Sequence, residues 1–208
     1  MWFYNAGTDS GAIYSRFGRT KSNKKQFTPT NTDLQGGTMI SKKMETAINE
    51  QINKELYSEY LYLSMQAFFA AQNLDGFANW MDVQCKEEHF HAMKFFTYLI
   101  DRGGKVELQA IAQPEVNFEN PLNAFTAVLK HEQFVTQSIN NLMDLAIQEK
   151  DFATKGLLDW YVNEQVEEEA SAEKIVRRLH FIGNDPQAIL ALDSELGKRV
   201  FTPPVVTQ

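Results

Sequence analysis

Apolar side chains recur every three or four positions through most of the chain after Met39. This is the period of an α-helix that buries one face. In the first such stretch the apolar positions include Ile48, Ile52, Leu56 and Leu63. The sequence holds no alternating run of strand length. The pattern therefore predicts an all-α protein.

Turn signals divide this pattern into four long helices and one short helix. Ser41 is a suitable N-cap for the first helix, and the turn residues at 73–76 end it. Glycines at 103–104 close the second helix, and Gly183 closes the fourth. The other long helices are expected at about 77–102, 122–150 and 152–182, and the short one from 187 to about 200.

The connections predict how these helices pack. Short turns make the first helix an antiparallel neighbour of the second, and the third an antiparallel neighbour of the fourth. Residues 104–121 are aperiodic and contain Pro114 and Pro121, which suits a crossover along the length of a bundle. The expected fold is a four-helix bundle with a long crossover between helices two and three and a short fifth C-terminal helix.

Residues 1–38 differ from the rest of the chain, which makes 39–208 the expected folded domain. Basic side chains outnumber acidic ones in this N-terminal extension, and no helical period appears. It lacks the apolar core of about 7–15 residues that a secretory signal peptide needs. Three interpretations stay open: an expression-derived or mis-assigned start, a natural disordered arm, or an organelle transit peptide.

Composition and charge exclude several classes of function. A net charge of −7 argues against nucleic acid as a partner and favours cations. No apolar run approaches the roughly 18–20 residues that span a bilayer, so no membrane partner is expected. The single cysteine, Cys85, cannot form an internal disulfide or a CxxC metal module.

The residues that carry chemistry are carboxylates at the middle of each long helix. Glu88 and His91 are three apart, so one helix turn presents both to the same metal ion. The other three helices supply Glu55, Glu132 and the pair Gln165 and Glu168. A lone glutamate is normally a solvated surface group. Four helices that each place a carboxylate on the apolar side favour a shared metal site, because buried charge is costly unless it is paired or binds metal.

Iron suits these ligand types. Fe(II) accepts carboxylate oxygen and imidazole nitrogen, and two ions about 3.5–4 Å apart need a bridging carboxylate. Four segments resemble those of the non-haem bacterial-type ferritins, and the likeness extends over about residues 39–200: Asn53–Ser58, Glu87–His91, Lys130–Gln133 and Glu164–Glu169. The expected fold is therefore ferritin-like.

The resemblance implies a role for each residue of the site. Glu55, Glu88 and His91 would hold the first iron, and Glu88 would bridge to a second iron. Glu132 and Glu168 would hold that second iron, with Gln165 beside it. A third, weaker iron site would be formed by Glu87, Glu164, Glu167 and the shared Glu168. Tyr62 and Trp160 match an aromatic pair thought to donate electrons during oxidation; core packing is the alternative for both.

Three features depart from the family pattern. Glu59 stands one turn after Glu55, where it either points inward as an additional carboxylate or rotates outward to the surface. His89 stands where bacterioferritins carry a haem-ligating Met. The fourth helix has Gln165-x-x-Glu168 where bacterioferritins repeat Glu-x-x-His, so a non-haem ferritin is indicated and no haem is expected. The N-terminal extension has no counterpart in the family.

The function implied by the resemblance is iron storage with ferroxidase activity. Dioxygen or hydrogen peroxide would oxidise Fe(II), and the Fe(III) mineral would collect inside a homo-oligomeric shell of 24 subunits with octahedral symmetry. The apolar face of the fifth helix would form four-fold contacts through Ile189, Leu190, Leu192 and Leu196. The expected location is cytoplasmic, or an organelle if residues 1–38 are a transit peptide. The alternatives are a non-catalytic shell subunit and a di-iron oxidase or peroxidase without storage.

Overall fold

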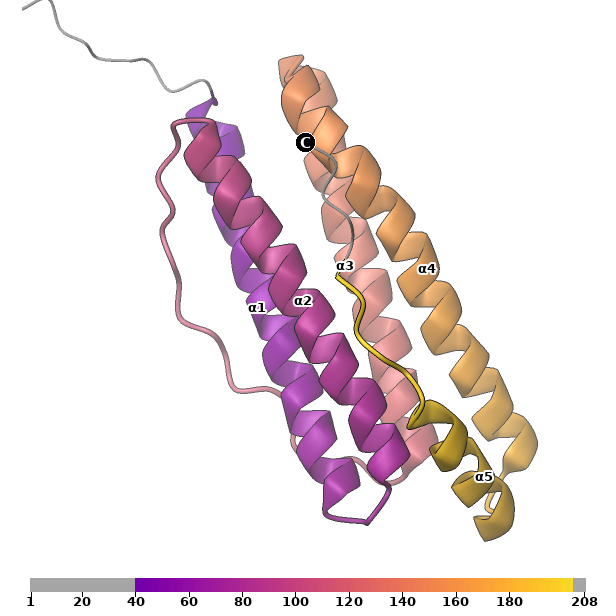
Figure 1. Ribbon diagram of the computed structural model, residues 1–208. Helices are drawn as coiled ribbons and strands as arrows, with labels where there is room; N and C mark the ends of the chain where they lie inside the picture. The colour runs from indigo at the N-terminus through magenta and orange to yellow at the C-terminus, as the bar shows by residue number, and fades with distance from the viewer. Residues whose placement is uncertain (1–39, 204–208) are drawn as a thin grey trace, which may run out of the picture. The chain divides into compact units, whose positions relative to one another are not determined.

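The protein folds into five helices (Figure 1). The computed structural model describes residues 40–203, and the prediction for residues 1–38 falls outside that range. The helices are α1 (Lys42–Ala70), α2 (Asp75–Asp101), α3 (Pro121–Glu149), α4 (Phe152–Ile182) and α5 (Pro186–Leu196). Residues 40–203 contain no strand, which confirms the all-α prediction.

Local capping explains where most helices begin and end. The Ser41 hydroxyl accepts a hydrogen bond from the backbone N–H of Met44, and Asn120 caps α3 in the same way. Gly103, which follows the C-cap Arg102 of α2, and Gly183, the C-cap of α4, take positive φ angles of 70° and 62°. A side chain with a Cβ resists this conformation, so glycine suits both ends.

The prediction for the end of the fifth helix was wrong. Instead of reaching about residue 200, α5 ends at Leu196. The side-chain amide of Asn79 on α2 donates to the backbone carbonyls of Leu196 and Arg199, over 3.2 and 3.0 Å. These two bonds hold the chain along α2, and the backbone of residues 197–203 is no longer helical.

The bundle consists of two helical hairpins. α1 packs against α2, and α3 packs against α4, while α1 also contacts α3. The connection between α2 and α3 runs along α1 (Figure 1). Asn49 donates to the carbonyl of Lys105, and Ser64 donates to that of Glu115, so α1 fixes the connection near both its ends. The predicted crossover is confirmed.

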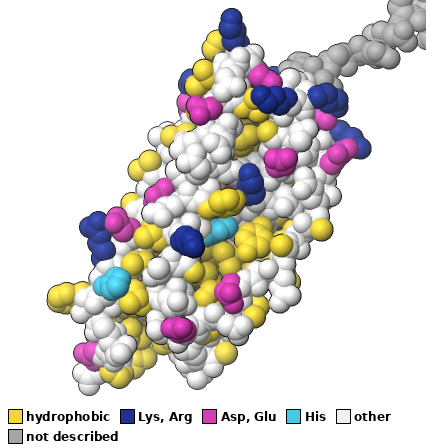
Figure 2. Space-filling view, turned by 180° about the vertical axis from the view of Figure 1, so that it is seen from behind, with side chains coloured by type: hydrophobic (Ala, Val, Ile, Leu, Met, Phe, Trp, Pro, Cys, Tyr) yellow, Lys and Arg dark blue, Asp and Glu magenta, His cyan; other side chains and the backbone are white. Residues whose placement is uncertain are grey.

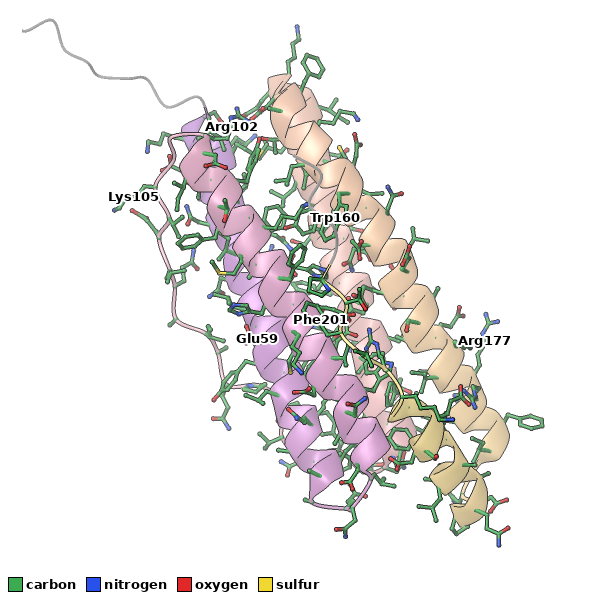
Figure 3. The ribbon with its side chains drawn as sticks, viewed as in Figure 1. Glu59, Arg102, Lys105, Trp160, Arg177 and Phe201 are labelled. Carbon is green, nitrogen blue, oxygen red and sulfur yellow. The ribbon has the colours of Figure 1, made fainter. Side chains whose placement is uncertain are left out.

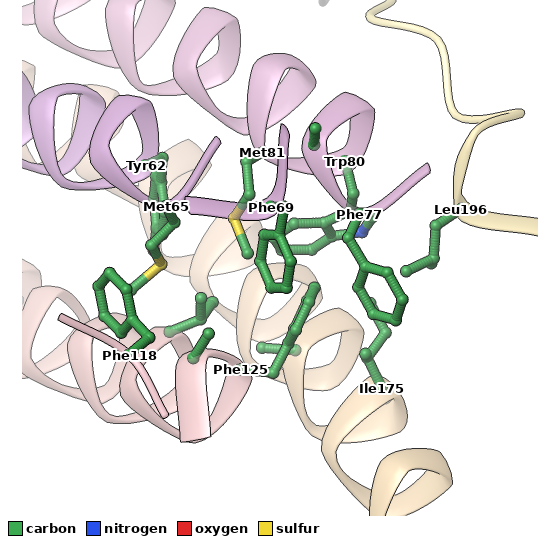
Figure 4. Close-up of a cluster of buried hydrophobic side chains, with 14 of the residues drawn as sticks. Tyr62, Met65, Phe69, Phe77, Trp80, Met81, Phe118, Phe125, Ile175 and Leu196 are labelled. Atoms are coloured by element: carbon green, nitrogen blue, oxygen red, sulfur yellow. The ribbon is translucent and has the colours of Figure 1, made fainter. Parts of the chain in front are cut away.

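The core has two apolar clusters, one toward each end of the bundle. In the first, the ring of Phe69 stacks on Phe77 at 5.1 Å, and Trp80 lies edge-on to Phe125 at 4.9 Å (Figure 4). Truncating one such buried aromatic typically costs about 3–5 kcal/mol. The second cluster includes the stacked rings of Phe95 and Tyr161. On every long helix, the predicted metal ligands fall between the residues of these two clusters.

Some apolar side chains stay at the surface of the single chain. Figure 2 shows hydrophobic groups gathered between charged ones on the face that Figure 1 hides. Exposed large residues among those described include Tyr60, Leu63, Phe134, Phe181 and Leu190. None of the helices between residues 40 and 203 is long and apolar enough to cross a bilayer.

Candidate metal site

Glu55, Glu88 and His91 form a compact buried group. One ligand atom from each lies within 4.8 Å of the others. The three residues are only 1%, 2% and 3% exposed. Glu55 comes from α1, and the other two come from successive turns of one face of α2. The carboxylate oxygen Oε2 of Glu55 is buried without a hydrogen-bond donor among residues 40–203. An orphaned buried acceptor of this kind fits a metal ligand.

Glu132 and Glu168 complete the buried carboxylates from the other hairpin. Glu132 accepts a hydrogen bond from the Tyr62 hydroxyl and another from the Gln165 amide, at 3.2 Å. Glu168 accepts from Gln84 at 2.7 Å. Both carboxylates lie near enough to Glu88 or to each other for mutual repulsion. The structure thus brings the four predicted glutamates, His91 and Gln165 into one interior layer.

Burial makes these carboxyl groups reluctant to ionise. Desolvation, and then repulsion by Glu88, raises the pKa of Glu55 from its ordinary 4.5 to about 8. Desolvation, and then repulsion by Glu132, raises the pKa of Glu168 to about 8 as well. The pKa values of Glu88 and Glu132 are also raised well above the ordinary range, first by burial. A bound cation would reverse this, because it favours the ionised form.

The predicted third set lies beside this buried layer. Glu87, Glu164 and Glu167 line a cavity of about 320 Å³ together with His91 and Glu168. Burial raises the pKa of Glu87, although the neighbouring Arg199 guanidinium opposes that rise. Glu167 is exposed. This third set of carboxylates is more open to solvent than the buried group of Glu55, Glu88 and His91.

The two predicted aromatic residues contact different ligands. Tyr62 is fully buried, and its hydroxyl donates a hydrogen bond to Glu132. Its pKa is raised well above 10, first by burial and then by Glu132. The Trp160 ring is half-buried and lies 5.5 Å from the ring of His91, edge to face. The Lys94 ammonium lies 4.2 Å from the centre of the indole.

Glu59 and His89 pair with each other outside the buried layer. The Nδ1 atom of His89 lies 3.1 Å from Oε2 of Glu59, and these side chains are 57% and 34% exposed. Figure 3 shows Glu59 at the side of the α1–α2 hairpin. Of the two orientations considered from the sequence, the structure has the outward one.

Two glutamines at the site were missed by the sequence reasoning. The Gln51 amide donates to Glu55 at 2.8 Å, and the Gln84 amide donates to Glu88 at 3.2 Å as well as to Glu168. Each glutamine stands four residues before its glutamate, and this spacing places both on one helix face. That repeated spacing is a signal by which both could have been found.

Fold and site together define a class. A helical bundle with carboxylates on all four long helices and a Glu-x-x-His pair is similar to the arrangement of ferritin-like di-metal carboxylate proteins, which carry two such pairs. Over residues 45–182 the chain matches the ferritin-like domain. The protein belongs to this ferritin-like family.

Curated relatives agree with this assignment. The chain is 40% identical over 163 residues to the bacterial non-haem ferritin of Staphylococcus aureus (strain MRSA252), which covers 78% of this chain and 98% of that protein. It is 42% identical over 155 residues to the corresponding ferritin of Campylobacter jejuni, with 74% and 93% covered.

Solved archaeal structures are similar as well. An open-pore ferritin from the hyperthermophilic archaeon Archaeoglobus fulgidus superposes with a TM-score of 0.77 at 53% identity, covering 78% of this chain and 99% of that one. A closed form of the same ferritin, engineered by site-directed mutagenesis, gives 0.78 at 54% identity, again with 78% and 99% covered. The resemblance noted from the sequence is confirmed.

Proposed function

We propose that this protein stores iron and oxidises Fe(II) to Fe(III) at a di-iron site within its bundle. The observation that carries the proposal is the buried group of Glu55, Glu88 and His91, with Glu132 and Glu168 in the same polar layer. Four buried carboxyl groups without a cation are costly to ionise. Two divalent ions would offset that cost.

The positions support one division of the ligands. Glu55, Glu88 and His91 would hold one iron, and Glu132 and Glu168 the other, with Gln165 beside the second. Glu88 interacts electrostatically with Glu55, which would hold the first ion, and with Glu168, which would hold the second. It is therefore the residue best placed to bridge both ions.

The oxidation uses the two ions together. Each Fe(II) gives up one electron, and the two electrons with two protons convert dioxygen into hydrogen peroxide. With hydrogen peroxide as the oxidant, the same two electrons and two protons give two molecules of water. The protein contributes fixed ligands and a layer from which bulk water is excluded. Binding of Fe(II) would displace protons from the carboxyl groups, because metal ligation needs the ionised form.

A third ion would bind in the neighbouring cavity, through Glu87, Glu164, Glu167 and the shared Glu168. All four line that cavity. The greater exposure of Glu167 suits a weaker site through which iron passes. Tyr62 and Trp160 would supply electrons to the centre, since one bonds to Glu132 and the other contacts the ring of His91.

The stored mineral requires a shell, which we propose to be a homo-oligomer of 24 subunits with octahedral symmetry. Of the four α5 residues assigned to four-fold contacts, Leu192 and Leu196 are buried within their own chain and Ile189 partly so. Leu190 is 58% exposed, and Phe181 at the end of α4 is 95% exposed. At this end of the bundle, these two apolar side chains are therefore available for contact with other subunits.

We place the protein in the cytoplasm, or in an organelle if residues 1–38 are a transit peptide, with Fe(II) and dioxygen or peroxide as substrates. It has no nucleic-acid or membrane partner in this proposal. A non-catalytic shell subunit is disfavoured by the full set of buried ligands. If the protein were instead a di-iron oxidase without storage, it would be active as a small oligomer and would form no mineral.

One experiment separates these functions. Several hundred Fe(II) ions per shell are added aerobically to the purified protein, and particle size and bound iron are then measured. A particle near 24 chains that keeps Fe(III) in solution supports storage. Iron that precipitates outside a small oligomer would overturn it. Glu88→Ala serves as the control, because it should assemble and yet lose the rapid oxidation.

A further inference from the structure

The chain after α5 turns back over the bundle and carries one arginine to the candidate metal site. Residues 197–203 run from the end of α5 along α2 toward the middle of the bundle, where Figure 3 labels Phe201. The carbonyls of Leu196 and Arg199 accept hydrogen bonds from Asn79. Phe201 and Thr202 then line the same cavity as Glu87 and Glu164.

The Arg199 guanidinium is held among α2 residues. Its Nη2 atom lies 2.5 Å from a carboxylate oxygen of Glu87. Its Nη1 atom donates to Oε1 of Gln84 at 2.9 Å and to the backbone carbonyl of Trp80 at 3.3 Å. The guanidinium also lies over the Trp80 ring, 4.5 Å from the centre. A positive group thus already neutralises part of the acidic cavity.

The same guanidinium is linked to the buried layer. A guanidinium has no acceptor, so it faces the oxygen of the Gln84 amide and leaves the NH₂ group directed inward. That NH₂ group donates to Glu88 and Glu168. Arg199 therefore connects the cavity to two ligands of the proposed centre through a single side chain.

We propose that Arg199 is a tethered counter-cation that competes with a metal ion for the carboxylates of this cavity. The inference rests on the proposed function, because the competing ion is the third ion assigned there. Glu87 cannot keep its short bond to the guanidinium and also bind a divalent ion without strong repulsion between the two positive charges. Arg199 lies on a non-helical segment, so it can leave without unfolding a helix.

Without a metal ion, the Arg199 guanidinium balances part of the negative charge of the cavity. A metal ion that fills the cavity displaces the guanidinium and releases residues 197–203 from this contact. An ion that binds Glu87, Glu164 and Glu167 displaces the guanidinium, and the segment loses its ion pair with α2. Affinity for the third ion is then set by the strength of the Arg199 contacts as well as by the ligands. The occupancy of the third site is thereby limited to high concentrations of the metal.

The test measures binding of Zn(II), which is redox-inert, to the assembled full-length protein by isothermal titration calorimetry. The variants are Arg199→Gln, which removes the charge, and Arg199→Lys, which keeps it. Arg178→Gln is the matched control, since Arg178 makes two short bonds to Glu195 between α4 and α5 and does not line the cavity. Arg199→Gln should tighten the weakest class of site about tenfold, whereas Arg199→Lys and Arg178→Gln should resemble the wild type.

A second measurement needs no variant. Hydrogen exchange of residues 197–203, followed by mass spectrometry, should quicken when Zn(II) fills the weakest site of the wild-type protein. Unchanged exchange, or equal affinities in Arg199→Gln and wild type, would overturn the inference. So would an Arg199→Lys variant that behaves like Arg199→Gln, because that result indicates a packing role. A different result would be a wild-type protein that shows no pair of tighter Zn(II) sites. That result would overturn the proposed di-iron function and the inference with it.

Discussion

The side-chain amide of Gln84 donates a hydrogen bond of 2.7 Å to Glu168, which joins α2 to α4 across the polar layer. Gln84 is fully buried, and the same NH₂ group lies 3.2 Å from Glu88. Two carboxylates from different helices are therefore held near one donor before any ion binds. Such a donor favours the ionised form of both groups, which is the form that binds metal.

Replacement of this amide should weaken metal binding. Gln84→Leu keeps the approximate volume and removes the donor, so ionisation of Glu88 and Glu168 becomes harder. We expect the affinity of the two tighter sites for Zn(II) at neutral pH to fall about tenfold. The control is Gln137→Leu, which changes an exposed glutamine on α3. Equal affinities in the two variants would show that the amide does not assist the ligands.

Glu88 and Glu167 should differ sharply in their effect on iron oxidation. Glu88 is buried and would touch both irons, whereas Glu167 is exposed at the cavity. Glu88→Ala should slow the fast phase of Fe(II) oxidation by more than about a hundredfold, and Glu167→Ala by less than about threefold. Stopped-flow absorbance of Fe(III) measures both. Similar rates would mean that the bridging ligand has been misplaced.

Metal binding should depend on pH through the buried carboxyl groups. The pKa values of Glu55 and Glu168 rise from 4.5 to about 8 in the folded, metal-free protein. The folded state thus binds these protons more tightly than the unfolded chain does. Their contribution to the free energy of unfolding is fully present below about pH 4.5 and is lost as the pH rises through about 8.

Bound metal reverses this dependence, because ligation displaces the protons. The increase in Tm caused by Zn(II) should therefore grow between about pH 6 and 8, and then level off. Differential scanning fluorimetry with and without Zn(II) tests this. Glu55→Gln, which cannot ionise, should reduce the slope. An increase in Tm that is constant over this pH range would contradict the assignment of these carboxyl groups as ligands.

Gly76 should control the docking of α5. A Cβ atom at this position would lie 1.7 Å from the backbone carbonyl oxygen of Asp193, so Gly76→Ala must push α5 away from α2. We expect a lower Tm and loss of the assembled particle in size-exclusion chromatography. Gly156→Ala is the matched control, since a Cβ there meets no atom within 4 Å. That change should stabilise the helix by about 0.5–1 kcal/mol. Normal assembly of Gly76→Ala would show that the docking of α5 on α2 is not needed for the assembled particle.

Tyr62 should act in electron transfer as well as in packing. Its hydroxyl donates to Glu132, and Tyr62→Phe removes that bond while the ring stays in the core. We expect a tyrosyl radical signal in freeze-quenched wild-type protein during oxidation, and its loss in Tyr62→Phe. Tyr161→Phe is the comparison, because its hydroxyl bonds to the backbone carbonyl of His91 instead. A radical signal that survives in Tyr62→Phe would leave this tyrosine with packing alone.

Local signals account for what the sequence could predict. The cap at Ser41 and the glycines at 103 and 183 act on their own neighbours, so the ends of three helices were foreseen. The burial of the carboxylates proposed as ligands on the four long helices could be predicted, because each carboxylate interrupts an apolar face. The end of α5 at the C-cap Gly197 was not foreseen, and the bonds from Asn79 on α2 that hold the chain after it join residues 117 and 120 positions apart. Arg199 reaches Glu87 across 112 residues of sequence, and no local pattern announces such a contact.

The polar layer also determines how far the helices can slide along one another. Apolar clusters lie on both sides of it on every long helix. A shift of α4 by one turn, about 5.4 Å, would carry Glu168 toward the aromatic rings around Phe69 or Phe95. It would also leave Gln84 without its partner on α4. The residues proposed to bind iron therefore set the axial register of the two hairpins, and a chain without them would have fewer constraints on that alignment.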